Sequence, residues 1–460
     1  MKILITGARS YVAYYWGLSL KAKHEVIYCD SLAHPFCRYV PFDSQYIRVA
    51  PPAQDTQGFK RDIQAIVLEH GVDLVMPTCE EVFYLSSFAG ELGCRLFCPD
   101  HSLLTDLHHK HHVFGLLPEC PGVFFPQTQL VFDRSDVMRL DTTILKPVFS
   151  RFGAKVIMNP KGDDLSAVDG SQPWVQQEKI TGRSLCSYAV AVNGKMVAYS
   201  CYHAKYSISN SAALGIDSVN YPKIEAFNKT FIERHNYTGQ VAFDFIEDEV
   251  RGGLYVIECN PRGTSGIHLL VLDDLEEAVF GTGAEVRTHQ KLMVFRQILG
   301  LYNRLGALSG GRRVNLSDEL RGSVDILNPA GEPAVSSRRW LLLFEMGWRM
   351  IRHGCSLAES TTYDIEWNGQ PLREPVLAPM QYWPLGDEHG DLRFSYGHPG
   401  GQLGLIRLRS PYGQLQIERV AGGDWSGVEA KIIHRKIRDQ EPERESIFCI
   451  ARRRSVESET

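Results

Sequence analysis

The sequence predicts an α/β protein that begins with a doubly wound parallel sheet and continues into a β-rich unit, so that the whole chain is α+β. Two observations predict this arrangement. Short apolar strands and helical stretches alternate over the first hundred residues, which is typical of a parallel sheet with helices on its faces. After about Thr105, hairpin signals replace that alternation. At about 150 residues per domain, 460 residues leave room for roughly three domains.

The first unit accounts for residues 1–104. Strands are expected at 2–6, 25–29, 73–76 and in the second half of 90–97, and helices at 10–20 and 59–69. Open parallel sheets hold ligands at the carboxyl ends of their strands. Gly7, Asp30 and residues 77–81 (PTCEE) lie at those ends, so we expect any ligand of this unit near them.

The remaining chain divides into three predicted parts, 105–285, 286–366 and 367–460. Helices are expected at 106–116, 221–235, 276–308 and 338–353, and strands at 143–147, 155–158, 174–180, 187–192, 196–201, 240–247, 254–258, 404–408 and 414–420. Asn193-Gly194 is a strong two-residue hairpin turn, and 251–253 (RGG) makes another. The last part is a small β-rich appendage.

Composition and charge limit the partners and the location that we expect for this protein. Lys+Arg 49 against Asp+Glu 54 gives a net charge of −5, so we expect neither nucleic acid nor an anionic membrane as a partner. Eleven cysteines without a Cys-x-x-Cys pair fit free thiols in a reducing compartment. The first apolar run stops at Thr6-Gly7 and is too short for a secretory signal, so a cytoplasmic protein is expected.

The most informative segment is residues 239–262 (GQVAFDFIEDEVRGGLYVIECNPR). In a hairpin, Asp244 lies on one strand, while Glu258 and Asn260, two residues apart, share a face of its neighbour. Two carboxylates and an amide oxygen suit Mg²⁺. Arg262 follows on the same face, where it could meet developing negative charge. The competing interpretation is a hairpin with solvated charges, but the surrounding strand residues are strongly apolar.

Two upstream segments suit a nucleotide. Lys146 ends a strand and is followed by a short loop at 150–155 (SRFGAK), whose amides can face a phosphate, although it has a single glycine. Residues 175–182 (VQQEKITG) run from a strand into a turn that can present a backbone donor and acceptor to a flat heterocycle.

In this order, over roughly residues 106–270, these pieces resemble the ATP-grasp superfamily. The corner PTCEE and the ending ECNPR (258–262) are similar to those of its carbamoyl-phosphate-synthetase-like members. The resemblance implies a Rossmann-like pre-ATP-grasp domain, a two-subdomain ATP-grasp fold and the appendage. It also implies an ATP- and Mg²⁺-dependent ligase, in which a small-molecule carboxylate becomes an acylphosphate and an amine then displaces phosphate, leaving ADP. By analogy, a homodimer is expected.

The resemblance also assigns roles to single residues. Arg262 and Lys146 would be catalytic, Lys110, Lys146, Lys155, Glu178, Ile180 and Lys205 would bind the nucleotide, and Asp244, Glu258 and Asn260 would bind the metal. Three features depart from the family pattern: Arg183-Ser184 replace a ribose-binding carboxylate, the lid loop is reduced to 152–155 (FGAK), and Ala242 stands where arginine is frequent.

Other interpretations remain open. A small-molecule kinase would use the same nucleotide site, and a non-catalytic nucleotide-binding protein would fit the thinned lid loop. His108 and His112 have the i, i+4 spacing of a helical metal site, although a third ligand is missing. A nicotinamide-dependent dehydrogenase is disfavoured because the later glycines of its fingerprint and its Tyr-x-x-x-Lys pair are absent.

Overall fold

The structure is a computed structural model. It describes residues 1–138, 142–150, 156–170, 172–208, 212–281, 286–305, 315, 318, 320–329, 340–370 and 372, and the strands at 383–384, 392–393, 406–409, 416–420, 428–435 and 446–453. No helix in these ranges is long and apolar enough to cross a membrane.

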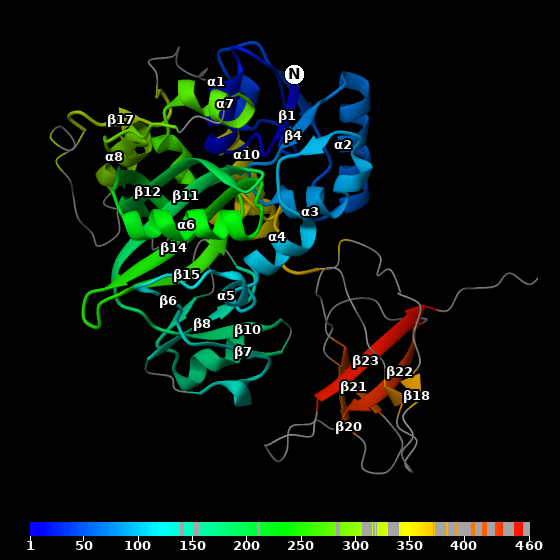
Figure 1. The fold of residues 1–460 in the computed structure, drawn as a ribbon. Helices are drawn as coiled ribbons and strands as arrows, with labels where there is room; N and C mark the ends of the chain where they lie inside the picture. Colours follow the sequence, from blue (N-terminus) through cyan, green and yellow to red (C-terminus); the bar gives the residue numbers. More distant parts are fainter. Residues whose placement is uncertain are drawn as a thin grey trace, which may run out of the picture.

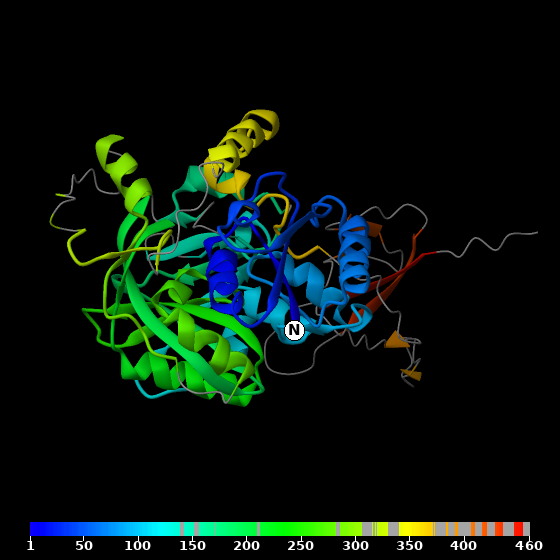
Figure 2. The same ribbon diagram turned by 90° about the horizontal axis from the view of Figure 1, so that it is seen from above.

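The first sheet is the parallel sheet that the sequence predicts. Its strands are β1 (Lys2–Thr6), β2 (Glu25–Asp30), β3 (Gln45–Arg48), β4 (Leu74–Met76) and β5 (Arg95–Leu96), in the order β3-β2-β1-β4-β5. Every neighbouring pair is parallel. Figure 2 shows α1 (Tyr11–Leu20) and α2 (Thr56–His70) on opposite sides of these strands, in keeping with the doubly wound prediction. The helices α3 (Glu81–Ser87) and α4 (His101–His108) complete this unit.

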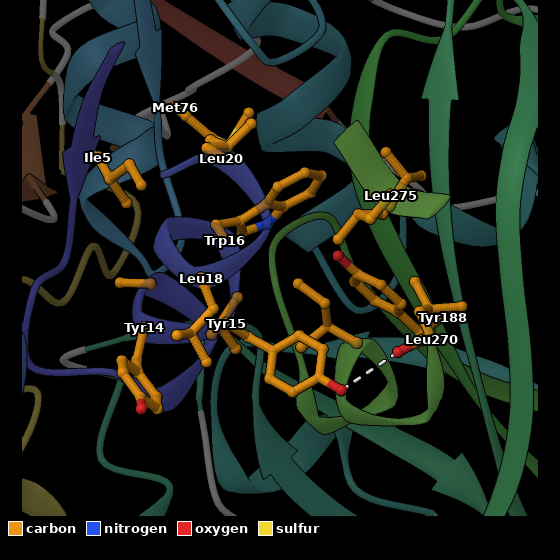
Figure 3. Close-up of a cluster of buried hydrophobic side chains, with 14 of the residues drawn as sticks. Ile5, Tyr14, Tyr15, Trp16, Leu18, Leu20, Met76, Tyr188, Leu270 and Leu275 are labelled. Atoms are coloured by element: carbon orange, nitrogen blue, oxygen red, sulfur yellow. Dashed lines mark hydrogen bonds between the residues drawn. The ribbon is translucent and has the colours of Figure 1, made fainter. Parts of the chain in front are cut away.

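Helix α1 joins the first unit to the second. Ser10 caps it by accepting a hydrogen bond from the Ala13 amide, and nearly all of its residues are buried, as expected of a helix that is apolar all round. Trp16 donates to the side chain of Gln240 at 3.0 Å, and the Tyr15 hydroxyl donates to the Leu270 carbonyl at 3.1 Å (Figure 3). A single hydrophobic core therefore extends across both units.

The second unit contains two sheets (Figure 1). The smaller is antiparallel, and the larger is mostly antiparallel, with parallel pairs only at β15–β6 and β16–β17. The larger has the order β17-β16-β13-β12-β11-β14-β15-β6, and the smaller has the order β7-β10-β8-β9. Their bounds are β6 (Val123–Phe124), β7 (Thr128–Val131), β8 (Thr143–Pro147), β9 (Ile157–Met158), β10 (Trp174–Glu178), β11 (Gly182–Val192), β12 (Lys195–Ile208), β13 (Ala212–Ser218), β14 (Gly239–Asp248), β15 (Leu254–Asn260), β16 (Met293–Val294) and β17 (Val324–Asp325). Helix α6 (Pro222–Arg234) packs on one face of the larger sheet, against β11 and β12, and leaves the other face to the first unit and the site.

The remaining elements extend along the second half of the chain. They are α5 (Val113–Leu116), α7 (Leu272–Phe280), α8 (Arg296–Leu305), α10 (Trp340–His353) and α11 (Leu357–Ser360), the 3₁₀ helices η1 (Phe36–Tyr39), η2 (Ala89–Glu91), η3 (Arg134–Asp136), η4 (Gly162–Ala167) and η5 (Ser265–Leu269), and the strands β18 (Trp383–Pro384), β19 (Leu392–Arg393), β20 (Ile406–Arg409), β21 (Gln416–Val420), β22 (Val428–Arg435) and β23 (Ser446–Arg453). The last six strands form three antiparallel pairs, in keeping with a β-rich appendage. The domain boundaries at 104, 285 and 366 stay predictions.

Two helix predictions are wrong in part. The helix expected over 106–116 ends at His108, because the His109 side chain accepts hydrogen bonds from the amides of His111 and His112 and His109 itself is extended. The stretch 276–308 is not continuously helical. Its buried residues Met293 and Val294 form β16, which pairs with β13, so burial in the larger sheet decided their conformation.

Candidate functional site

The predicted metal-binding residues meet on the β14–β15 hairpin. Asp244 lies directly opposite Glu258, and Ala242 opposite Asn260, so Asp244, Glu258 and Asn260 share one face. A β-bulge follows at once, since Phe245 pairs with Val256. Bulges bend a strand and redirect side chains, and they are frequent beside active sites.

Burial, and then the like charge of Glu258, affect the ionisation of Asp244. Burial and the neighbouring Glu258 carboxylate raise the pKa of Asp244 to about 7. The Asn260 side-chain amide donates to Asp244 Oδ2 at 3.1 Å. All three side chains are half-buried. The donor set is oxygen-only, and a cation bound between the two carboxylates would relieve their mutual repulsion, so these residues fit Mg²⁺.

Two lysines bring positive charge to the carboxylates. Lys146, on β8, is almost fully buried and donates to the side-chain oxygen of Gln177 at 3.0 Å. Lys110, equally buried, donates to the Ser150 carbonyl at 2.7 Å and lies 3.9 Å from Glu258 Oε2. Burial lowers the pKa of Lys146 to about 8. Burial also acts to raise the pKa of Glu258, but attraction to both lysines outweighs it and leaves that pKa below its usual value.

Arg262 lies at the end of the same face and is held by three acceptors. Its Nε donates to Glu80 Oε1 at 2.9 Å, its Nη2 to Asn260 Oδ1 at 3.2 Å, and its Nη1 to the Gly263 carbonyl at 3.2 Å. Burial acts to lower the pKa of Arg262, but the buried Glu80 carboxylate outweighs it and raises that pKa. The guanidinium is therefore charged and fixed.

Glu80 contacts Arg262 in the candidate site, although sequence reasoning left it without a role. It belongs to the PTCEE corner, after β4, and the corner is fixed by Glu81, whose Oε1 accepts from the Thr6 hydroxyl and from the amides of Thr78 and Cys79. Gly7 allows the close approach, because it has φ of 70° and a Cβ there would lie 2.7 Å from Thr78 Oγ1. The PTCEE motif, in which Glu80 is the fourth residue, was the feature of the sequence that could have identified it.

The other predicted nucleotide-binding residues lie along β10 and β12 or outside the described residues. Glu178 pairs with Arg251 at 2.6 Å, and Ile180 is buried just beyond β10. The Lys205 ammonium lies 5.8 Å from the centroid of the Tyr206 ring. Lys155 falls outside the described residues. The roles of these four residues in nucleotide binding stay predictions.

The structure also shows the surroundings of Arg183 and of the pair His108 and His112. Arg183, which replaces the expected ribose carboxylate, pairs at 2.7 Å with Glu247, so a carboxylate lies next to that position on the adjacent strand. His108 and His112 do not share a helix, because α4 ends at His108. Among the described residues, no group of three His, Cys, Asp or Glu side chains is placed to hold a metal ion.

Comparisons with known proteins show the fold. No family model and no curated protein matches the sequence. Among solved structures, an N5-carboxyaminoimidazole synthetase from Staphylococcus aureus is 14% identical, with a TM-score of 0.50, over 66% of this chain and 85% of that one. Its complex with ADP is 15% identical, with a TM-score of 0.50, over 63% and 80%. The ADP complex of an N5-carboxyaminoimidazole ribonucleotide synthetase is 14% identical, with a TM-score of 0.50, over 66% and 85%. The chain therefore has the predicted ATP-grasp fold.

Proposed function

We propose that this protein is an ATP- and Mg²⁺-dependent ligase that activates a small-molecule carboxylate as an acylphosphate and joins it to an amine. The observation that carries the proposal is the arrangement of charge around one sheet face. Two opposed carboxylates lie on the larger sheet, two buried lysines approach them from β8 and from the loop after α4, and one arginine is fixed beside them. The ADP complexes of proteins with the same fold support nucleotide use.

Asp244, Glu258 and Asn260 would hold the metal, which supplies positive charge to the phosphate oxygens when bound. Lys110 and Lys146 bind and orient the phosphates. Because both lysines are buried, their attraction for a phosphate is stronger than it would be in water. With its pKa near 8, Lys146 is mostly protonated at neutral pH.

The reaction has two balanced steps. A carboxylate oxygen of the substrate forms a bond to the γ-phosphorus, and the bond from that phosphorus to the β,γ-bridging oxygen breaks, so that ADP leaves. The amine nitrogen then forms a bond to the acyl carbon, phosphate leaves with the former carboxylate oxygen, and the amine loses a proton to water. Arg262 stabilises the negative charge that develops on the acylphosphate, since Glu80 and Asn260 hold its guanidinium in place.

The test is ADP release from MgATP across a panel of carboxylates and amines, first singly and then in pairs, with the product identified by mass. Turnover that requires a pair, with a condensed product, is expected. Phosphorylation of a single compound, without a condensed product, would contradict the ligase and favour a small-molecule kinase. Binding of ATP without turnover of any pair would favour the non-catalytic alternative. Replacement of Asn260 by alanine should abolish turnover in a folded protein, and full activity in that variant would contradict the metal assignment.

A further inference from the structure

Residues 345–370, which we call the return segment, begin within α10 and lie against the first unit. The two carboxylate oxygens of Glu345 accept from the amides of Ala33 and His34 at 2.9 and 2.8 Å. The Tyr84 hydroxyl donates to the Glu366 carbonyl at 2.5 Å. These partners lie just after β2 and in α3, so the return segment covers the carboxyl ends of the first parallel sheet.

A buried ionic group anchors the middle of the return segment. Asp364 pairs with Arg9 at 2.6 Å and with Arg349 at 3.0 Å, and it accepts from the Ser31 hydroxyl at 2.5 Å. Arg9 also pairs with Asp30 at 2.6 Å. This is the edge at which open parallel sheets bind ligands, and here the chain's own Asp364 satisfies the charge.

Trp367 follows this anchor and joins three parts of the molecule. Its ring centroid lies 5.2 Å from that of Phe83 on α3, 6.3 Å from that of His108 at the end of α4, and 5.0 Å from that of Phe149 after β8. The Phe149 ring also lies 5.5 Å from the His108 ring. Trp367 is 2% exposed, so the contacts are those of a packed core.

The aromatic cluster holds both ends of the contact that places Lys110. His108 lies two residues before Lys110, and Phe149 directly precedes Ser150, whose carbonyl accepts from Lys110 Nζ. The Lys110 amide also donates to the Val148 carbonyl at 3.4 Å. Without the indole, neither His108 nor Phe149 keeps its packing partner from the return segment.

We propose that Trp367 is a positioning residue for Lys110, and through Lys110 for the phosphates of ATP. The inference rests on the proposed function, because it takes Lys110 as a phosphate-binding group. Lys110 is a buried cation 3.9 Å from Glu258, so a displacement of about 1 Å changes its interaction with both the carboxylate and the phosphate.

The first experiment measures MgATP binding by calorimetry. Trp367→Ala should weaken binding about tenfold, while Trp367→Phe, which keeps an aromatic ring, should stay within about threefold of the wild type. Trp340→Ala is the matched control, because Trp340 is exposed on α10, and it should bind as the wild type does. If Trp367→Ala does not fold, Trp367→Leu replaces it with the same expectation.

A double-mutant cycle with Lys110→Met separates positioning from general destabilisation. If Trp367 acts through Lys110, Trp367→Ala should have little further effect on binding in the Lys110→Met background. Additive losses would overturn the inference.

Hydrogen exchange without nucleotide provides a second measurement. The amides of Lys110 and Val148 should exchange about tenfold faster in Trp367→Ala, and that of Ala189 on β11 should not change. Unchanged exchange, together with unchanged binding in a wild type that does bind MgATP, would overturn the positioning role and leave the proposed function intact. A wild type that binds no MgATP would overturn both.

Discussion

Charged side chains are grouped in two regions of this molecule, and the pairing of their charges differs. At the carboxyl ends of the first sheet, Asp364 and Asp30 share Arg9, and Arg349 adds a second positive charge. On the face of the larger sheet, Asp244 and Glu258 lie opposite each other as like charges. In the first region each carboxylate contacts an arginine directly, whereas in the second the two carboxylates face each other and their lysines lie further away.

The pKa shifts express the same difference. Burial acts to raise the pKa of Asp364, but attraction to Arg9 outweighs it and holds that pKa well below its usual range. In the other region, burial and Glu258 act together to raise the pKa of Asp244 to about 7. Opposite charges in contact make a structural site, while adjacent like charges make a site that gains stability when it binds a cation.

The largest expected effect is on turnover. Glu258→Gln keeps the shape of the side chain but removes one of the two opposed charges, so ADP formation should fall about 10³-fold, or about 4 kcal/mol. The melting temperature should fall modestly, because the Glu258 carboxylate also loses its attraction for the buried Lys110 and Lys146. Glu249→Gln, on the exposed turn of the same hairpin, is the matched control for kinetics. Full turnover in Glu258→Gln would contradict a functional role for the paired carboxylates of the larger sheet.

The next effect is on stability. Asp364→Asn leaves Arg9 and Arg349 without their shared carboxylate, and removing one partner of a buried ion pair typically costs about 3–5 kcal/mol. Urea unfolding followed by circular dichroism measures the loss. Asp318→Asn, which breaks an exposed pair with Arg321, should cost less than about 1 kcal/mol. Equal losses in the two variants would contradict a structural role for Asp364.

The pH dependence of that loss has a defined sign. Because the pKa of Asp364 is lowered in the folded state, its contribution to stability is fully present above the unfolded pKa of about 3.9 and is lost as the pH falls further. The difference in unfolding free energy between wild type and Asp364→Asn should therefore be constant from about pH 5 to 8 and shrink below about pH 4. A difference that grew on acidification would have the wrong sign for this ion pair.

The smallest effect distinguishes the regions by their response to a cation. Millimolar Mg²⁺ without nucleotide should raise the melting temperature of the wild type by about 1–3 °C, because only the folded protein presents the paired carboxylates. The same addition should not stabilise Asp244→Asn, but it should stabilise Asp364→Asn as much as the wild type. Scanning calorimetry with Na⁺ at matched ionic strength is the control. A response that survives in Asp244→Asn would place the cation elsewhere.

The sequence predicted the carboxylate cluster because its geometry is local. Asp244 and Asn260 are sixteen residues apart, the glycine-containing turn between them marks a hairpin, and alternation along a strand puts Glu258 beside Asn260. The parallel first sheet was predictable for a similar reason, since each strand and helix carries its own periodic pattern. Two helix predictions failed because other interactions outweighed the local pattern. At β16, packing in the larger sheet decided the conformation, and at His109 the side chain accepts hydrogen bonds from backbone amides.

What the sequence by itself determined is the set of elements and the one cluster that lies within a single hairpin. Only the tertiary structure decided that Glu80 holds Arg262, that Asp364 fills the edge of the first sheet, and that Trp367 reaches Phe149. These contacts join segments up to 355 residues apart. Strand periodicity is a property of neighbouring backbone units, whereas such contacts exist only after the separate units have packed together, and no local pattern encodes which surfaces will meet.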